Sequence, residues 1–178
     1  MAEIIARKRN SETGIVETKR VLVDDSDYGW LSLWKWSLNK NGYIYRSVWS
    51  NGEHSTISMH RFIMDTPADL QVDHKNHDIT DNRRSNLRNC TCAENSYNRH
   101  SRRGSFSRHR GVYWESGRGK WRAEIRRGRE RVRIGRYGNE IAAAKAYNVK
   151  AKELFGEFAC LNNIVESGQQ YPLFEESA

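Results

Sequence analysis

Short apolar runs alternate with short polar runs in the first 60 residues, a pattern that predicts strands joined by tight turns. Residues 16–24 place apolar side chains on either side of a charged patch, and residues 43–49 alternate with the two-residue period of a half-buried strand. Asn-Gly pairs at 41–42 and 51–52 predict turns on both sides of that second strand. Residues 55–60 then read as its hairpin partner.

The acidic opening and apolar spacing of residues 24–36 predict a short helix rich in aromatic side chains. Large aromatic residues dominate the burial energy of a small module. We therefore expect four aromatic residues and one leucine to form the core of an N-terminal module: Tyr28, Trp30, Leu33, Trp34 and Trp36. Stacking of one of these tryptophans on a nucleic-acid base is the alternative.

Short apolar runs also flank the most polar stretch of the chain. Residues 59–64 predict one short helix, and residues 70–74 and 85–91 predict two strands. A T-x-x-E capping box predicts a further helix over residues 92–100. The polar loop between the two strands must be held by internal hydrogen bonds, because it contains little that can be buried.

Three close strands and one long amphipathic helix are predicted in the last third, at residues 110–115, 120–127, 131–137 and 139–156. One face of the helix is apolar: Ala143, Ala146, Tyr147, Ala151, Leu154 and Phe155. Alternation in the middle strand points Trp121, Ala123 and Ile125 toward this helix and Arg122, Glu124 and Arg126 away from it. Together the segments predict an α+β protein.

Composition limits the size of the core and separates one strongly basic segment from the rest. Only 37% of the 178 residues are hydrophobic and 29% are charged, which favours two or three modest cores over one large core. Residues 99–136 contain 14 Lys and Arg against three acids, whereas the whole chain has a net charge of +8. This local excess is typical of a protein that binds a polyanion.

The three cysteines, Cys90, Cys92 and Cys160, include no C-x-x-C pair, which indicates neither a disulfide framework nor a zinc knuckle. No apolar run is long enough for a signal peptide or a membrane span. We therefore expect a soluble, monomeric protein that is located in the cytoplasm or the nucleoid of a bacterial host cell. A phage is a possible source of the gene.

Residues 72–98, VDHKNHDITDNRRSNLRNCTCAENSYN, carry the candidate chemistry. The order V-D-H, D-N-R-x-x-N-L-R and T-x-x-E-N-x-x-N resembles the HNH nuclease motif of phage and bacterial homing endonucleases, in which two strands and a helix form a ββα-metal unit. The resemblance implies that Asp73 is a metal ligand and that His74 is the general base for phosphodiester hydrolysis. It also implies that Asn95 is the second metal ligand, with Asn98 as the alternative.

Hard oxygen ligands of this kind favour one divalent ion, Mg²⁺ with Mn²⁺ as the alternative, over zinc. Asn86 matches the central Asn of the motif, and we expect it to tie the loop together and orient His74. Arg88 and Arg99 are candidates to contact phosphate. His60 is expected to pack beneath the site, and His109 is expected at the surface or facing DNA.

Residues 110–162 resemble the DNA-binding domain of the plant ethylene-response-factor (APETALA) family on RGVYW, KWRAEIR, RIGRY, the Ala-rich helix and the closing LN. The resemblance implies a three-stranded antiparallel sheet packed on one helix, with the outer face of the sheet in the DNA major groove. The residues expected to face DNA are Arg110, Arg118, Arg122, Glu124, Arg126, Arg131, Arg133 and Arg136. Tyr113 and Glu115 stand where the plant proteins have arginines, so their sequence preference does not transfer.

The expected organisation has six parts: a flexible N-terminus (1–14), a β-rich support module (15–58), an HNH nuclease unit (59–100), a basic linker (101–109), the ethylene-response-factor type domain (110–163) and a polar tail (164–178). The function expected from it is a metal-dependent endonuclease of double-stranded DNA, targeted by its C-terminal domain. A non-catalytic DNA-binding transcriptional regulator is the alternative, and an RNA-binding accessory protein ranks last because no RNA-binding motif is present. The sequence does not indicate the target site, nor whether one DNA strand or both strands are cut.

Overall fold

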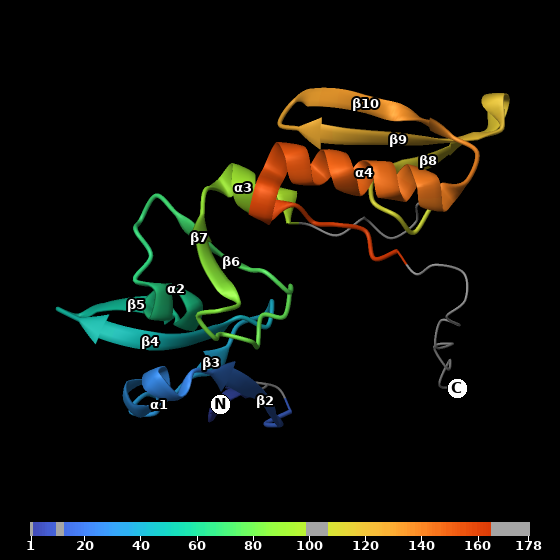
Figure 1. Cartoon of the computed structure of the whole chain (residues 1–178). Helices are drawn as coiled ribbons and strands as arrows, with labels where there is room; N and C mark the ends of the chain where they lie inside the picture. The colour runs from blue at the N-terminus through green and yellow to red at the C-terminus, as the bar shows by residue number, and fades with distance from the viewer. Residues whose placement is uncertain (1, 10–12, 99–106, 165–178) are drawn as a thin grey trace. The chain divides into compact units, whose positions relative to one another are not determined.

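The computed structural model describes residues 2–9, 13–98 and 107–164 (Figure 1). The chain divides into two compact units, unit 1 (Met1–Asn98) and unit 2 (Arg99–Ala178). Several sheets and few helices make up the described part, which confirms the α+β class. None of the described helices is long and apolar enough to cross a membrane.

Unit 1 is built on a five-stranded sheet of order β2-β1-β3-β4-β5. Its strands are β1 (Ala2–Arg9), β2 (Val16–Val23), β3 (Ser37–Leu38), β4 (Ile44–Ser50) and β5 (Glu53–Ser58). A second sheet pairs β6 (Gln71–His74) with β7 (Leu87–Cys90). The helices are α1 (Asp25–Leu31), α2 (Met59–Met64) and α3 (Cys92–Tyr97). Apart from the N-terminal strand and the two-residue β3, the sequence predicted these elements to within a few residues at their ends.

The first residues form strand β1, so the flexible N-terminus expected for residues 1–14 is wrong for Ala2–Arg9. The strand pairs with β2 along its whole length, from Ala2 opposite Val23 to Arg9 opposite Val16. Ile4 and Ala6 are buried while Glu3 and Ile5 are exposed. Apolar positions two residues apart give a strand one core-facing side even when its other side is charged.

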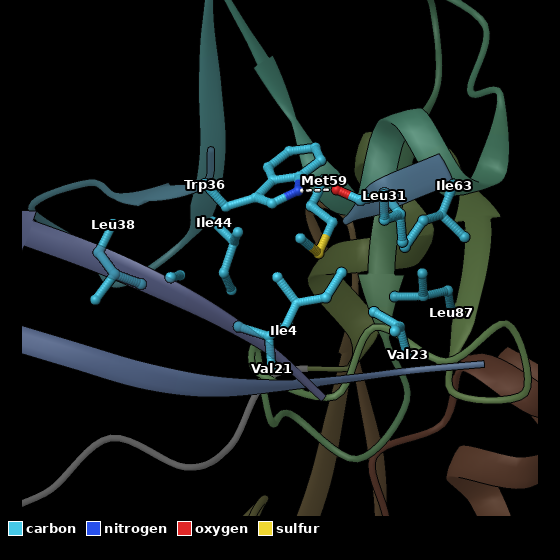
Figure 2. Packing of buried hydrophobic residues seen from close by; sticks show 11 residues of the cluster. Ile4, Val21, Val23, Leu31, Trp36, Leu38, Ile44, Met59, Ile63 and Leu87 are labelled. Atoms are coloured by element: carbon cyan, nitrogen blue, oxygen red, sulfur yellow. Dashed lines mark hydrogen bonds between the residues drawn. The ribbon is translucent and has the colours of Figure 1, made fainter. Parts of the chain in front are cut away.

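A single hydrophobic core holds unit 1 together and joins the two parts that were expected to be separate (Figure 2). Ile4, Val21 and Val23 of the five-stranded sheet meet Met59 and Ile63 of α2. The same cluster includes Leu31, Trp36, Leu38, Ile44 and Leu87. The expected boundary between residues 58 and 59 is therefore not a domain boundary, because the β-rich part and the part that carries Asp73 share buried side chains.

The aromatic core expected around residues 24–36 is only partly correct. Trp36 is buried and its Nε1–H donates to the carbonyl oxygen of Leu31 at 2.9 Å (Figure 2). Leu33 and Trp34, in contrast, are 77% and 45% exposed. Trp34 instead covers the guanidinium of Arg46, whose Cζ lies 3.9 Å from the ring centroid, a cation–π contact. Tyr28 is also exposed, and Trp30 is partly buried.

Unit 2 contains an antiparallel sheet of order β10-β9-β8 with helix α4 along one face (Figure 1). The elements are β8 (Val112–Glu115), β9 (Lys120–Arg127), β10 (Glu130–Tyr137) and α4 (Glu140–Phe155), with 3₁₀ turns at Ser116–Arg118 and Gly156–Phe158. The core forms where Val112 and Ala123 of the sheet meet Ala143 and Ala144 of the helix. This is the three-stranded sheet on one helix that the sequence predicted.

Two expected parts fall largely outside the described residues, namely residues 99–106 and 165–178. The described end of the expected linker differs from a solvated segment, because Ser107 and His109 are buried. Ser107 Oγ donates to Glu140 Oε1 at 2.7 Å, and Nδ1 of His109 lies 3.0 Å from the same oxygen. His109 is therefore not the surface or DNA-facing residue that was expected: it fastens the start of unit 2 to the first turn of α4.

Candidate functional site

Asp73 and His74 end strand β6, and strand β7 holds Asp73 in place. Asp73 lies directly opposite Arg88 in the ladder. The Arg88 Nε and Nη2 donate to Asp73 Oδ2 at 2.9 and 2.6 Å, and both side chains are buried. Arg88 therefore holds the carboxylate, which differs from the phosphate contact expected for it.

Asn98, at the C-terminal end of α3, adds a second support to Asp73. Its Nδ2 donates to both carboxylate oxygens at 3.0 Å and to the backbone carbonyl of His74 at 3.2 Å. Among the described residues, Oδ2 of Asp73 therefore accepts from Arg88 and Asn98, whereas Oδ1 accepts from Asn98 alone. Oδ1 is the oxygen with more capacity left for a metal ion.

His74 is buried and oriented by Asn82, which is fully buried. The Nε2 of His74 lies 3.4 Å from Oδ1 of Asn82, whose Nδ2 donates to the carbonyl of Ile79 at 3.2 Å. Because the amide nitrogen is engaged with Ile79, its oxygen faces the imidazole and accepts from Nε2–H. Nδ1 then keeps its lone pair. Burial lowers the pKa of His74 below its usual value, which favours the neutral ring.

Two aromatic rings from outside the motif pack beside His74. His60 of α2 stands edge-on to it with centroids 5.4 Å apart, and Tyr43 lies 6.4 Å away. Tyr43 and His60 also contact each other, at 5.5 Å. Burial, together with the charges of His74 and Arg61, lowers the pKa of His60 to about 4. His60 is thus a neutral neighbour of the site, in the packing position that was expected.

The loop between β6 and β7, residues 75–86, is held by its own polar groups. Asn86 accepts from the backbone N–H of Asn76 at 3.0 Å and donates to the carbonyl of Asp81 at 2.8 Å, which are the side-chain to backbone bonds expected of it. Asp81 binds Nε and Nη2 of Arg83 at 2.7 Å each. These hydrogen bonds lower the pKa of Asp81. The loop is therefore rigid without an apolar core of its own.

Strand β2 and helix α1 anchor the same loop to unit 1. Leu22 donates its N–H to Thr80 O at 2.9 Å and accepts from the N–H of Asn82 at 2.8 Å. Arg84 forms two hydrogen bonds with Asp27 of α1, at 2.8 and 2.9 Å. Asp27, Asp81 and Tyr43 were not expected at the site. Only the D-x-R spacing of Asp81 and Arg83 is visible as a local signal in the sequence.

Helix α3 begins with the predicted capping box, in which Thr91 Oγ1 accepts from the N–H of Glu94 at 3.2 Å. Its Asn95 donates to Oε1 of Gln71 at 2.7 Å. Gln71 and Asp73 are two residues apart on β6 and therefore share one face of the strand. Thus Asn98 contacts Asp73 directly, whereas Asn95 contacts Gln71, two residues earlier on the same face of β6.

The donor set fits an open site for a hard divalent ion. One carboxylate and the amide oxygens of α3 are oxygen donors of the kind that Mg²⁺ accepts, with its remaining positions filled by water and substrate phosphate. The described residues contain no cluster of three or more His, Cys, Asp or Glu placed to hold a metal ion.

Unit 2 carries the predicted arginine face on the side of the sheet away from α4. The ladder places Arg131 opposite Arg126, Arg133 opposite Glu124 and Arg136 opposite Arg122. Glu124 is buried and lies 3.4 Å from Arg122 and 3.5 Å from Arg131, so its carboxylate orients both arginines. Glu115 pairs with Arg136 at 2.6 Å and lies 3.8 Å from Arg118.

Arg126 and Arg133 are exposed on this face and form no ion pair with a described residue, so their charges are available to a ligand. Arg110 contributes its backbone, which exchanges hydrogen bonds with the side chain of Asn162 at 2.6 and 3.1 Å. Arg99 lies outside the described residues.

Comparison with known proteins identifies the first unit. The profile of the HNH endonuclease family matches residues 65–97, which include Asp73, His74, Asn86 and Asn95. An uncharacterized HNH endonuclease of Acanthamoeba polyphaga mimivirus is 34% identical over 140 residues, covering 75% of this chain and 70% of the viral protein. No solved structure matches. On these similarities the chain belongs to the HNH endonuclease family.

Proposed function

We propose that this protein is a metal-dependent DNA endonuclease, in which β6, β7 and α3 form a ββα-metal site that hydrolyses phosphodiester bonds. The observation that carries the proposal is the pair at the end of β6. Asp73 is held by Arg88 and Asn98, and the adjacent His74 is held by Asn82. A preorganised carboxylate next to an oriented neutral imidazole is what water-activating hydrolysis requires.

His74 is the general base in this proposal. With Nε2–H directed to Asn82, the lone pair of Nδ1 takes a proton from the attacking water. Asn82 then stabilises the imidazolium through the same hydrogen bond, since a charged donor strengthens it. The packed rings of His60 and Tyr43 limit rotation of the imidazole. Each of these contributions belongs to the chain itself.

Asp73 and Asn95 would hold the metal ion, and Mg²⁺ or Mn²⁺ suits these oxygen donors. When bound, such an ion stabilises charge on the phosphorane and on the leaving 3′ oxygen. Asn95 lies on α3 within residues 65–97, the segment that the family profile matches. Asn98, whose amide already makes three contacts with Asp73 and His74, positions the carboxylate.

Unit 2 supplies targeting by binding duplex DNA on its arginine face. This part of the proposal rests on the resemblance to the ethylene-response-factor domain together with the exposed Arg126 and Arg133. Arginine suits both guanine edges and phosphates. Helix α4 covers the apolar face of the three-stranded sheet, which leaves the opposite, charged face accessible to a groove of DNA.

Cleavage of supercoiled plasmid with Mg²⁺ tests the catalytic proposal. The parent protein should produce nicked or linear DNA, and the reaction should stop with a chelator. His74→Ala should lose most of this activity, by a factor of roughly 10²–10⁴ for a missing general base, while it still binds DNA. His54→Ala, at an exposed histidine whose ring lies in a tilted contact with that of Trp49 (centroids 5.0 Å apart), is the matched control and should cleave normally. Equal cleavage by His74→Ala and parent would reject the base, and binding without any cleavage by the parent would favour a DNA-binding regulator.

The second metal ligand is tested by metal binding rather than by activity. Asn95→Ala should weaken Mn²⁺ binding, followed by electron paramagnetic resonance, with little change in stability because its side chain is partly exposed. Asn98→Ala should lower stability more, because it removes a buried donor from Asp73. Normal Mn²⁺ affinity in Asn95→Ala together with its loss in Asn98→Ala would assign the ligand to Asn98.

Charge removal on the sheet tests the targeting proposal. Arg126→Gln with Arg133→Gln should weaken binding to duplex DNA and lower the slope of log Kd against log salt, by about 0.9 for each lost phosphate contact. Arg127→Gln is the matched control, because it lies on the same strand with its side chain on the alternate face. Equal effects at Arg127 and at the arginine face would show that the face does not hold DNA.

A further inference from the structure

A hollow of about 240 Å³ on unit 1 carries charge that the proposed catalytic site does not use. It lies where β1 and β2 meet the turn between β3 and β4. Lys8 comes from β1, Lys19 from β2 and Lys40 from the turn, and Glu17 is the acidic residue of the lining. Three ammonium groups against one carboxylate leave the hollow with a net charge of +2.

The hollow is suited to an anionic group rather than to an apolar ligand. Its lining is polar apart from Leu38, and its volume is below the roughly 300 Å³ at which pockets for drug-sized molecules begin. Among the described residues, none makes a hydrogen bond or ion pair with the ammonium group of any of the three lysines, and Glu17 offsets only one of the three charges. Lys19 is half-buried, which brings one ammonium into the wall of the hollow. The net positive charge is suited to a phosphate group, and the hollow is large enough to admit one.

The turn that closes the hollow is fixed by hydrogen bonds. Oδ1 of Asn39 accepts from the N–H of Asn41 at 2.9 Å and from the N–H of Tyr43 at 3.0 Å. The N–H of Gly42 donates to the carbonyl of Asn39 at 3.0 Å. Lys40 is therefore presented on a preorganised turn, so less conformational entropy is lost when an anion binds.

The same turn touches the catalytic loop. Gly42 has φ +84°, and a Cβ placed on it would lie 3.1 Å from Cδ1 of Ile79 and 3.5 Å from Nζ of Lys19. Ile79 belongs to the loop of residues 75–86, and its carbonyl accepts the hydrogen bond that orients Asn82. The next residue of the turn, Tyr43, has its ring 6.4 Å from that of His74. Gly42 of the hollow and its neighbour Tyr43 thus connect the lysine hollow to the loop of residues 75–86 and to His74 within unit 1.

We propose that the lysine hollow, defined by Lys8, Lys19 and Lys40, binds a backbone phosphate of the DNA strand beside the scissile phosphate. The inference rests on the proposed nuclease function, because DNA whose scissile bond lies at His74 carries further phosphates on both sides of it. Lysine binds such a phosphate as a point charge, without reading a base. The hollow would therefore set how the strand lies across the site and add affinity that does not depend on sequence.

Binding of a DNA duplex, chosen to contain the mapped cut where the parent cleaves, is measured without metal ion over a range of salt concentrations to test the hollow. Lys8→Gln/Lys19→Gln/Lys40→Gln should weaken Kd by roughly tenfold and lower the salt slope by about 0.9. Lys35→Gln removes an exposed lysine that does not line the hollow, and it should leave Kd within about twofold of the parent. The exposed pair Lys8→Gln/Lys40→Gln provides the same test should the triple variant fold poorly.

Phosphate ethylation interference on the same duplex adds a positional readout. The parent should lose binding when a phosphate beside the cut is ethylated, and the triple variant should no longer be sensitive at that phosphate. If the parent binds DNA and the triple variant matches Lys35→Gln in Kd, slope and interference, the hollow holds no phosphate. Absence of cleavage by the parent would reject the nuclease function alone, because this comparison is made without metal ion. Absence of DNA binding by the parent would reject both.

Discussion

Asp73 and Arg88 face each other across the β6–β7 ladder, and two guanidinium nitrogens bind the same carboxylate oxygen at 2.9 and 2.6 Å. Only 6% of Asp73 and 9% of Arg88 are exposed, so each charge depends on the other for the solvation that it lost on folding. The geometry also divides the carboxylate, with Oδ2 committed to the protein and Oδ1 left with a single amide donor. An acid can be rigid and still have capacity to bind a ligand when its partners occupy one oxygen.

Replacing Arg88 should therefore destabilise unit 1 strongly. Arg88→Met leaves Asp73 buried without its cation, and we expect a loss of about 3–5 kcal/mol in the free energy of unfolding, measured by urea denaturation. Arg88→Lys keeps the charge but not the two-pronged geometry, so it should recover only part of this loss. A loss below about 1 kcal/mol in Arg88→Met, the size expected of a surface pair, would mean that the pair does not hold Asp73.

Arg84 should couple the loop of residues 75–86 to helix α1 through Asp27. The side chain of Asp27 is only 6% exposed, whereas that of Arg84 is 51% exposed, and screening by solvent keeps the pair modest. A double-mutant cycle of Asp27→Asn and Arg84→Gln should give a coupling free energy of about 1 kcal/mol. Hydrogen exchange should become faster in residues 75–86 of both single variants. Unchanged exchange in that loop would show that β2 alone anchors it.

The buried His60 should make stability fall in mild acid. Its pKa is about 4 in the folded protein and 6.5 in the unfolded chain, so between these values the unfolded state binds the proton and the native state does not. The free energy of unfolding therefore rises with pH across this window, by up to about 3 kcal/mol. The rise is complete above pH 6.5. Urea denaturation at several pH values measures the slope. His60→Gln should flatten it, and an equally steep slope in that variant would place the titration elsewhere.

Local patterns accounted for most elements because they depend on neighbours in sequence. The capping box of Thr91 and Glu94 marks the start of α3, and the alternation around Arg122 and Glu124 correctly separated the two faces of β9. Contacts between distant segments had no such signal. Asp27 and Arg84 are 57 positions apart, and nothing in either segment indicates the other.

The choice between Asn95 and Asn98 shows the same limit within the site. Residues three apart lie on one side of a helix, so periodicity treats the two amides alike. Only the way α3 crosses β6 brings Asn98 to Asp73 and Asn95 to Gln71. The exposure of Trp34 could likewise not be predicted from the sequence, because an aromatic residue that covers an arginine has the same local pattern as one that enters a core.

Gly111 should be the least replaceable glycine of unit 2. It has φ +70°, and a Cβ placed there would lie 2.3 Å from Cε2 of Tyr147 and 2.4 Å from the backbone oxygen of Glu124. Its own carbonyl accepts the N–H of Glu124 at 2.9 Å, so the backbone cannot move away without breaking a sheet contact. Gly111→Ala should cost about 2–5 kcal/mol, since left-handed backbone strain adds to overpacking.

Hydrogen exchange of strands β8, β9 and β10, followed in the full chain at increasing urea concentrations, measures this cost. Tryptophan fluorescence would not, because four of the six tryptophans belong to unit 1. Gly117→Ala is the matched control, because its φ is not positive and a Cβ there meets nothing within 4 Å. Adding Tyr147→Leu to Gly111→Ala removes the ring but not the clash with Glu124 O, so it should restore only part of the stability. Full tolerance of Gly111→Ala would mean that β8 can shift against α4, and with it the sheet that is proposed to hold DNA.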